Sequence, residues 1–416
     1  MHALEKILAL KAGKTAVTTG EIVNCEVDWA GINDLYLQTV RSFHEIGGKR
    51  LAKPDRVVMF MDHYAPASTI IQADNQKQFR AFLREHGAHR IMDVNQGVCH
   101  QVLADNGFSK PGQLMVVTDS HTTTHGAFGA FGTGVGATDM ATILATGSLW
   151  FRVPEILRIT LTGTPRKGVF SKDVILHVIG RLGADYAVYK GVEFAGPTLA
   201  CWGVSERMAL CNMSTEMGAK CSYIEPDAVT MEFLKKRNIA EYEIFRTDRD
   251  FRYAEELTFD VSDIGPQLAV PSSVDNVEPL ENHLGQRIDQ AYIGSCTGGR
   301  LEDLAVAASM LRGRKIPSTV RLLIVPASRG VLLEAMEKGY IRDLVEAGAT
   351  LVTPSCAACL GTHQGLLAPG EVCISATNRN FPGRMGSTEA KIFLGSPAAV
   401  AASALAGSIS DPAMYF

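Results

Sequence analysis

The sequence lacks the features that mark membrane-spanning, nucleic-acid-binding and intrinsically disordered proteins. It has no run of about 18 or more apolar residues, which a membrane-spanning helix would need. Its 40 Lys and Arg residues nearly balance 44 Asp and Glu residues, and the formal net charge of -4 argues against nucleic acid as the main partner. With 46% hydrophobic and 20% charged residues, most of the chain is expected to fold.

The N-terminus also lacks the features of a signal peptide. The first residues, MHALEKILALKAGK, predict an amphipathic helix and contain no apolar h-region followed by a small-residue cleavage site. We therefore expect a cytoplasmic protein, whose thiols stay reduced. The nine cysteines are then not expected to form a disulfide framework, and most of them suit small core positions.

Short apolar runs alternate with helical patterns along the whole chain, which predicts an α/β fold. The predicted strands are 56–61, 114–118, 157–161, 291–293 and 320–325. The predicted helices are 33–45, 75–86, 137–151, 300–311 and 328–338. Because typical domains have about 150 residues, we expect three α/β subdomains, 1–155, 156–280 and 281–416, of which the first two can also form one unit. Segment 264–286 has three prolines and little periodicity, and it predicts a linker or domain boundary.

Three cysteines lie in loops rather than in apolar patterns. Cys356 and Cys359 lie in TPSCAACLG, and Cys296 lies in the glycine-rich GSCTGGR. A redox dithiol would open a helix in a thioredoxin-like unit and would not need Cys296, while two core cysteines remain an alternative. Three loop cysteines are one short of a closed zinc site, and they also fit an iron–sulfur cluster with one iron left open. Cys373 is a rival third ligand, but it lies in the strand pattern EVCIS.

Histidines and aspartates gather at the predicted strand ends. Asp119, His121 and His125 lie in DSHTTTH, directly after the strand LMVVT. On a helix, histidines four residues apart share a face and could bind a metal, although the run of threonines argues against a regular helix. An acid/base pair and a hydrogen-bonded turn are the other interpretations. Similar places, after a strand or before a helix, are taken by His63, next to Asp62, and by His100.

Two further loops are rich in glycine or arginine. The run GAFGAFGTGVGA contains G-x-G-x-x-A at Gly132, Gly134 and Ala137, but the preceding strand ends too far upstream for a dinucleotide site, so we expect close packing beneath a helix instead. The loop NRNFPGRMG carries Arg379 and Arg384, whose planar guanidinium groups suit carboxylates. A solvated basic turn is the alternative, and the flanking apolar and glycine residues argue against it.

Taken together, GSCTGGR, SCAACLG, TDSHT and NRNFPGRMG resemble motifs of the aconitase superfamily. The resemblance covers nearly the whole chain, from Asp62 to the loop of Arg384. It implies aconitase-like α/β/α three-layer subdomains around a central cluster site. The chain is too short to include the C-terminal swivelling domain of a full aconitase, and it is similar in size and ending to the large subunits of two-subunit members.

The resemblance also implies a set of functional residues. One [4Fe-4S] cluster is implied, held by Cys296, Cys356 and Cys359, with one iron not ligated by cysteine. The residues implied to act in catalysis are Asp62, His63, His100, Asp119, Ser120, His121 and Glu216. The residues implied to bind substrate or to support the cluster region are Asn212, Asn378, Arg379 and Arg384. Gly298 and Ser355 depart from residues that are common in the superfamily, Asn and Gly, but neither departure removes a ligand.

The implied activity is dehydration and rehydration of a hydroxy di- or tricarboxylate by the large subunit of a hydro-lyase. We expect 3-isopropylmalate dehydratase of leucine biosynthesis first, with homoaconitase or 2,3-dimethylmalate dehydratase as alternatives. The base that removes the carbon-bound proton is then expected on a small subunit that carries the swivelling domain. Two alternatives from other classes are a zinc-dependent hydrolase using Asp119, His121 and His125, and a cluster-free scaffold or RNA-binding relative, which the near-neutral charge disfavours.

Overall fold

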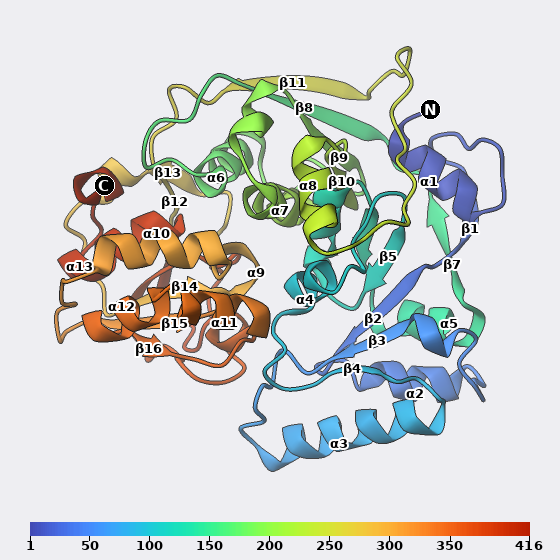
Figure 1. Ribbon diagram of the computed structural model, residues 1–416, viewed down its shortest axis with the longest axis horizontal. Coiled ribbons are helices and arrows are strands. Elements are labelled where there is room, and N and C mark those ends of the chain that lie inside the picture. Colours follow the sequence, from blue (N-terminus) through green and yellow to red (C-terminus); the bar gives the residue numbers. More distant parts are fainter.

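Three mainly parallel β-sheets follow one another along the chain, each with helices packed around it (Figure 1). The structure is a computed structural model and describes residues 1–416. The first sheet has the order β4-β3-β2-β5-β6 and is parallel throughout. Its strands are β2 (Trp29–Asn33), β3 (Val57–Phe60), β4 (Arg90–Met92), β5 (Leu114–Val117) and β6 (Phe131–Gly134). Its helices are α1 (Ala3–Lys11), α2 (Gln38–Glu45), α3 (Ile70–Glu85), α4 (Cys99–Asp105) and α5 (Ala137–Thr146).

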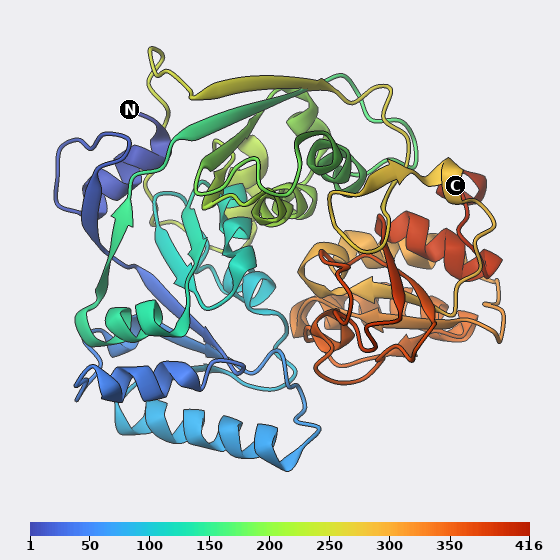
Figure 2. The same cartoon turned by 180° about the vertical axis from the view of Figure 1, so that it is seen from behind.

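The second sheet is also parallel and has the order β10-β9-β8-β11. Its strands are β8 (Ile156–Thr162), β9 (Gly191–Ala195), β10 (Cys221–Tyr223) and β11 (Glu255–Asp260). Its helices are α6 (Ser171–Leu182), α7 (Val204–Met213) and α8 (Ala228–Lys236). Strands β8 and β11 run as a long pair along one edge of the molecule, from the N-terminal part toward the C-terminal part (Figure 2).

The third sheet has seven strands in the order β13-β12-β18-β17-β14-β15-β16. They are β12 (Gln267–Ala269), β13 (Val277–Pro279), β14 (Gln290–Gly294), β15 (Arg321–Val325), β16 (Thr350–Leu351), β17 (Val372–Ser375) and β18 (Lys391–Leu394). Its helices are α9 (Ser295–Gly298), α10 (Leu301–Leu311), α11 (Arg329–Glu337), α12 (Tyr340–Ala347) and α13 (Pro397–Ala406). Strands β18 to β16 are parallel, and α13 packs on β14. The predicted α/β class is therefore confirmed.

One predicted helix is too long, because a second element follows it. Helix α5 ends at Thr146, and Gly147 takes the left-handed conformation with a φ of 76°. The next residues form β7 (Ser148–Arg152), which pairs antiparallel with β1 (Ile22–Glu26). In β7 the side chains of Leu149 and Phe151 are buried while Trp150 is exposed, which is the two-residue period of a strand. The prediction of a helix over 137–151 is therefore wrong beyond residue 146.

The proline-containing segment 264–286 is structured and is not a free linker. It contributes β12 and β13, which pair antiparallel with each other, and β12 also pairs with β18. The three sheets thus consist of residues 29–134, 156–260 and 267–394. The subdomain boundaries at 155 and 280 stay a prediction. None of the helices combines the length and the hydrophobicity that crossing a bilayer requires.

The first and third sheets meet at the carboxyl ends of their strands. A small apolar cluster there combines Val58 and Phe60 of β3 with Cys296 and Cys356 of the third sheet's loops. In open α/β sheets ligands bind outside the carboxyl ends of the strands. The loops that follow β3, β5, β14, β16 and β17 are therefore brought together where the two sheets meet.

The glycine-rich run after β5 allows backbone to pack on backbone. A Cβ at Gly126 would lie 2.1 Å from the carbonyl oxygen of Ser222, and one at Gly132 would lie 2.2 Å from that of Thr122. Such contacts leave no room for a dinucleotide beside these glycines. The predicted close packing of this run is confirmed.

Gly126→Ala is expected to lower the free energy of unfolding by about 1–3 kcal/mol, because the new methyl group overlaps the backbone of β10. The matched control is Gly136→Ala in the same run, where φ is -79° and no atom lies within 4 Å of the added Cβ. Urea unfolding of both variants and of the unsubstituted chain measures the difference. Equal destabilisation by the two substitutions would contradict this packing.

Candidate functional site

The three loop cysteines come together at the carboxyl ends of the third sheet. Cys296 lies in α9, directly after β14. Cys359 lies in the 3-10 helix η6 (Ala357–Leu360), and Cys356 directly precedes that helix. All three are buried and none forms a disulfide. The hydroxyl of Ser295 lies 3.8 Å from Cys296 Sγ and 3.4 Å from Cys359 Sγ, and so joins the two loops.

Both cysteine loops have a strained backbone. Ser295 has a φ of 69° and Ala357 a φ of 46°, in the left-handed region that residues with a Cβ rarely occupy. Such residues cost about 1–3 kcal/mol each and gather at functional sites. Gly298, in the first loop, must be small, because a Cβ there would lie 2.4 Å from the Cβ of Ala376. The local sequence therefore holds the cysteines in place at some cost in stability.

Hydrogen-bond donors point at the cysteine sulfurs. Asn212 Nδ2 lies 3.1 Å from Cys296 Sγ, Asn378 Nδ2 lies 3.5 Å from the same sulfur, and Arg384 Nη2 lies 3.8 Å from Cys359 Sγ. Donors of this kind stabilise thiolates more than thiols, because a charged acceptor strengthens the hydrogen bond. In the metal-free chain burial, with the charge of Cys359, raises the pKa of Cys296 to about 11. A bound cation would reverse that shift, so this donor set fits a metal centre held by thiolates.

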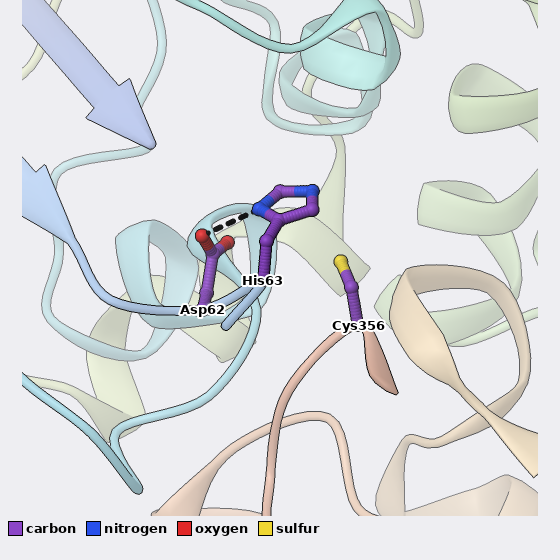
Figure 3. Close-up of side chains that lie close together, drawn as sticks. All are labelled: Asp62, His63 and Cys356. Atoms are coloured by element: carbon purple, nitrogen blue, oxygen red, sulfur yellow. Dashed lines mark hydrogen bonds and ion pairs between the residues drawn. The ribbon is translucent and has the colours of Figure 1, made fainter. Parts of the chain in front are cut away.

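On the first sheet, opposite the cysteine loops of the third sheet, Asp62 and His63 follow β3. Asp62 accepts hydrogen bonds from Asn33 Nδ2 at 3.0 Å and from the backbone N–H of Cys99 at 2.9 Å. His63 Nδ1 lies 2.8 Å from Asp62 Oδ1. Burial alone would lower the pKa of His63, but the Asp62 carboxylate outweighs it, and the pKa rises to about 9. Figure 3 shows Cys356 pointing from the third sheet's loop toward the side chains of Asp62 and His63.

Asp119, after β5, is the centre of a second hydrogen-bond network. Its Oδ1 lies 3.0 Å from His100 Nε2 and accepts from the backbone N–H of His121 at 2.8 Å. Burial opposes ionisation of Asp119, but its hydrogen bonds from His100 and His121 hold its pKa well below the ordinary value. A long contact of 3.8 Å from His63 Nε2 to Asp119 Oδ2 links this network to the Asp62 pair.

The network continues through His121 to the other two sheets. His121 Nε2 lies 2.7 Å from Glu216 Oε1, and Arg379 Nε donates to the two Glu216 oxygens at 2.9 and 3.1 Å. Burial opposes ionisation of Glu216, but the contacts with His121 and Arg379 lower its pKa. Arg379 is 28% exposed, so the outer end of the network reaches the surface.

The structure does not form the alternative zinc site of Asp119, His121 and His125. Residues 120–128 form the 3-10 helix η2 (Ser120–Phe128), in which residues four apart point in different directions, about 120° apart. His125 Nδ1 bonds to Ser109 Oγ instead, at 2.8 Å. The groups whose ligand atoms do lie within 4.8 Å of one another are Asp62, His63 and Cys356, and Cys99, His100 and Asp119.

The other candidate residues also have defined places. Ser120 is exposed on η2, unlike its neighbours Asp119 and His121. Arg384 is 8% exposed, and its guanidinium lies over the ring of Phe381 at 5.7 Å. The predicted residues thus converge on one region from all three sheets, with Ser120 at its outer margin.

Sequence reasoning missed three residues of this region. Asn33 donates to Asp62, and Asp34 accepts from the backbone N–H groups of His63 and Tyr64. The sequence predicted a helix from residue 33, whereas β2 ends at Asn33 and α2 begins only at Gln38, so that prediction is wrong over 33–37. Lys172, 2% exposed, donates to the carbonyl oxygens just before Asn378, and no sequence signal separates it from a solvated lysine at a helix start.

Comparisons with known proteins agree with this arrangement. A model of the aconitase family (aconitate hydratase) matches residues 5–407. The chain belongs to the aconitase family. It is 49% identical to a probable 3-isopropylmalate dehydratase large subunit of Methanothermobacter thermautotrophicus, over 99% of each chain. It is 48% identical to a probable methanogen homoaconitase large subunit of the same organism, over 99% of this chain and 97% of the relative.

Other comparisons extend this assignment. The 3-isopropylmalate dehydratase large subunit 1 of Pyrococcus furiosus is 44% identical over 99% of this chain and 98% of the relative. The solved aconitase X of Thermococcus kodakaraensis in its holo-form has a TM-score of 0.53 and 14% identity, covering 91% of this chain and 89% of that chain, and it supports the fold alone.

Membership of the aconitase family confirms two predictions, the activity class and the fold, and supports the predicted cofactor and partner in their coarser form. The chain is a hydro-lyase of this family, and its fold is aconitase-like. The family implies a [4Fe-4S] cluster, in agreement with the buried cysteines. The relatives are named as large subunits, which implies a small-subunit partner for this chain.

Glu216→Gln is expected to lower the free energy of unfolding of this chain by about 2 kcal/mol at pH 7, because it removes the charge that His121 and Arg379 contact. Since the folded-state pKa of Glu216 lies below 4.5, its contribution is present above pH 4.5 and is lost as the pH falls through the folded-state pKa. The gap between variant and parent should therefore narrow below pH 4.5. Urea unfolding at several pH values measures it.

The matched control is Glu334→Gln, which removes an exposed carboxylate 3.7 Å from Lys338. Such a surface pair contributes about 0–1 kcal/mol, so the control should unfold almost as the parent does. A gap for Glu216→Gln that stays constant down to acidic pH would argue against an ionised Glu216 in the folded chain.

Proposed function

We propose that the chain is the large catalytic subunit of a [4Fe-4S] hydro-lyase that dehydrates and rehydrates a hydroxy di- or tricarboxylate, with 3-isopropylmalate as the first candidate. The observation that carries the proposal is the meeting of two sets of groups. Three buried cysteines, two of which have donors aimed at their sulfurs, lie on one side, and buried Asp–His pairs lie on the other. A dehydratase needs both a Lewis acid and proton donors at one hydroxyl group.

In this proposal the cluster ligands are Cys296, Cys356 and Cys359. When bound, the cluster supplies Lewis acidity toward the substrate's hydroxyl and carboxylate oxygens through an iron that no cysteine ligates. Asn212 and Asn378 donate to the sulfur of Cys296 and so hold its orientation and stabilise its charge. Cys373 lies in β17, hydrogen-bonds to a neighbouring carbonyl oxygen and is left out of the set.

The Asp–His pairs supply the proton for the departing hydroxide. Asp62 orients His63, and Asp119 orients His100, so each imidazole is held in a defined position beside the cysteine loops. The raised pKa of His63 keeps that ring protonated at neutral pH, as a general acid requires. Glu216 and His121 extend the same network and hold it rigid against the third sheet.

In this proposal the arginine loop after β17 binds the carboxylates of the substrate. Arg379 is held at Nε by Glu216, which leaves its terminal nitrogens free to form a bidentate contact with a carboxylate. Arg384 is held near Cys359 and presents a second cation close to the cluster ligands. Ser120, exposed at the outer margin, is placed to contact substrate or the partner subunit.

The choice of substrate rests on the relatives. Identities of 49% to a probable 3-isopropylmalate dehydratase and 48% to a probable homoaconitase large subunit make homoaconitase the second candidate. Acid residues, metal ligands and carboxylate-binding arginines are all found in this chain, whereas an evident base for the carbon-bound proton is not. We therefore assign the base, and the swivelling domain that carries it, to the small subunit.

Replacement of any one of Cys296, Cys356 and Cys359 by Ser is expected to abolish the broad visible absorbance of the reconstituted chain and its bound iron and sulfide. Cys373→Ser is the matched control, because that thiol is buried but outside the proposed ligand set, and it should retain both. Absorbance spectra with iron and acid-labile sulfide analysis measure the outcome. Loss of the cluster in Cys373→Ser together with its retention in Cys296→Ser would overturn the ligand assignment.

The reconstituted chain is expected to be inactive by itself and to gain dehydratase activity when its small subunit is added. The assay compares 3-isopropylmalate, homocitrate and 2,3-dimethylmalate at equal concentration and ranks them by kcat/KM. Highest kcat/KM with 3-isopropylmalate supports the first candidate, and highest kcat/KM with homocitrate supports the second. Full turnover without any second polypeptide would show that the base lies in this chain and that the two-subunit proposal is wrong.

A further inference from the structure

A large cavity lies outside the candidate functional site. It has a volume of about 1080 Å³ and shares no residue with that site. Its wall consists mainly of residues from α4 of the first sheet, α7 and α8 of the second, and α10 and α11 of the third. On α4, His100 contacts Asp119, whereas Gln101 and Asp105 line the cavity. A ligand in this cavity would therefore contact the helices of all three sheets without touching the residues of the proposed reaction.

Four helices begin at this cavity. The first residues of α7, α8, α10 and α11 all line it, namely Val204 and Ser205, Ala228 and Val229, Leu301 and Glu302, and Arg329 and Gly330. The first N–H groups of a helix have no partner within the helix, and this end carries a partial positive charge. Asp227 caps α8 and Ser328 caps α11, whereas no side chain caps α7. Several helix starts around one cavity favour a negatively charged ligand.

Arg300 supplies a buried cation in the same wall. This residue is 2% exposed and directly precedes α10. Its Nε donates to Gln101 Oε1 at 3.2 Å, whereas its Nη2 is buried and has no hydrogen-bond partner. Buried side-chain donors are ordinarily paired, because leaving one unpaired costs free energy. The unpaired nitrogen is thus independent support for an acceptor that this chain itself does not supply.

The carboxylates that line the cavity are already paired with other groups. Asp105 accepts from Ser328 Oγ at 2.6 Å, Glu302 accepts from Ser205 Oγ at 2.7 Å, and Glu232 and Glu334 lie 3.2 and 3.7 Å from Lys236 and Lys338. Among the lining cations, Lys236 is occupied by Glu232, and Arg237 lies 3.5 Å from Asp105. Arg300 and Arg329 form no salt bridge with any of these carboxylates. Two guanidinium groups of the cavity are therefore available to an anion.

Two further carboxyl groups close to Arg300 offset its charge only in part. Asp303 accepts from the backbone N–H of Arg300 at 2.9 Å, and Glu206 accepts from that of Ser171 at 2.7 Å. Neither forms a salt bridge with the guanidinium of Arg300. Burial raises the pKa of Asp303 to about 7 and also raises the pKa of Glu206, so neutral pH does not keep both fully ionised.

We propose that this cavity binds a small organic anion whose carboxylate or phosphate group contacts the terminal nitrogens of Arg300. A guanidinium fork matches the paired oxygens of either group. The apolar side chains of Val229, Phe233 and Leu333 also line the cavity, and Leu333 is 50% exposed. They provide a surface for an apolar body, and the volume is that of a typical ligand site rather than of a single inorganic ion. This site goes beyond the proposed hydro-lyase activity and does not depend on it.

Binding can be measured by isothermal titration calorimetry on the full-length chain, without cluster or partner. The probes are phenyl phosphate, hexanoate, inorganic phosphate and the uncharged 1-hexanol. At least one of the two organic anions should bind with a stoichiometry of one and more tightly than inorganic phosphate, and 1-hexanol should not bind. The comparison of phenyl phosphate with hexanoate shows which head group the site prefers. The bound probe should also raise the midpoint of thermal unfolding, because it stabilises the folded chain.

Two variants test the arginines of the cavity. Arg300→Lys keeps the charge but loses the planar fork, and it should weaken binding of the organic anion about 10–100-fold. Arg329→Glu reverses an exposed charge at the start of α11 and should weaken binding about 3–10-fold. The second variant changes a surface residue, so it answers the question even where Arg300→Lys fails to fold.

The matched control for the charge reversal is Arg41→Glu, which changes the net charge equally at an exposed position of α2 outside the cavity. It should leave the affinity unchanged. Arg379→Lys tests for binding at the candidate functional site instead, and it should also leave the affinity unchanged.

Three results would overturn the proposal. The first is the absence of binding by both organic anions, and the second is an affinity for inorganic phosphate equal to theirs, which would indicate an adventitious ion only. The third is weaker binding in Arg379→Lys together with unchanged binding in Arg329→Glu, which would place the anion at the candidate functional site. Failure of the hydro-lyase proposal would show as absent turnover of the two-subunit enzyme and would leave these titrations unaffected.

Discussion

The main-chain junction between the loops of the first and third sheets is the constraint on which the site depends. The backbone N–H of Cys356 donates to the carbonyl oxygen of Asp62 at 2.8 Å. A second junction pairs Gly97 with Ser328 as an isolated β-bridge, and a Cβ at Gly97 would lie 2.4 Å from a carbonyl oxygen of that loop. Because these bonds join backbone to backbone, they hold Cys356 close to Asp62 independently of the side-chain rotamers.

Charge balance, more than apolar packing, then holds the side chains in place. Asp119 and Glu216 are ionised in a buried region, which is stable only because His100, His121 and Arg379 contact them. Removing one partner would leave a buried charge unpaired, so the groups stabilise one another as a unit. The network also ties the three sheets together, because its members come from each of them. The same contacts therefore serve both the fold and the proposed chemistry.

The parts of this site that lie at strand ends could be predicted, because short apolar runs are easily recognised and the residues after them are polar. Asp62, Asp119 and Cys296 follow β3, β5 and β14 in this way. Asn33 was missed because β2, with the sequence WAGIN, has few β-branched residues and gave no strand signal. The early end of α5 was missed because Gly147 was not recognised as a left-handed helix terminator, although such glycines are common there.

Contacts between distant segments could not be predicted, and they decide which polar residues matter. Lys172 begins an amphipathic helix and resembles a solvated lysine, yet its ammonium group donates to the carbonyl oxygen of Thr377 at 2.5 Å, 205 residues away. Burial lowers the pKa of Lys172 to about 8, against the opposing charges of Cys296 and Cys359. A buried cation next to the loop of Asn378 is stable only where negative charge lies close to it. The cysteine set supplies that charge once its thiols are deprotonated, so the position of Lys172 is independent support for thiolate ligands in this region.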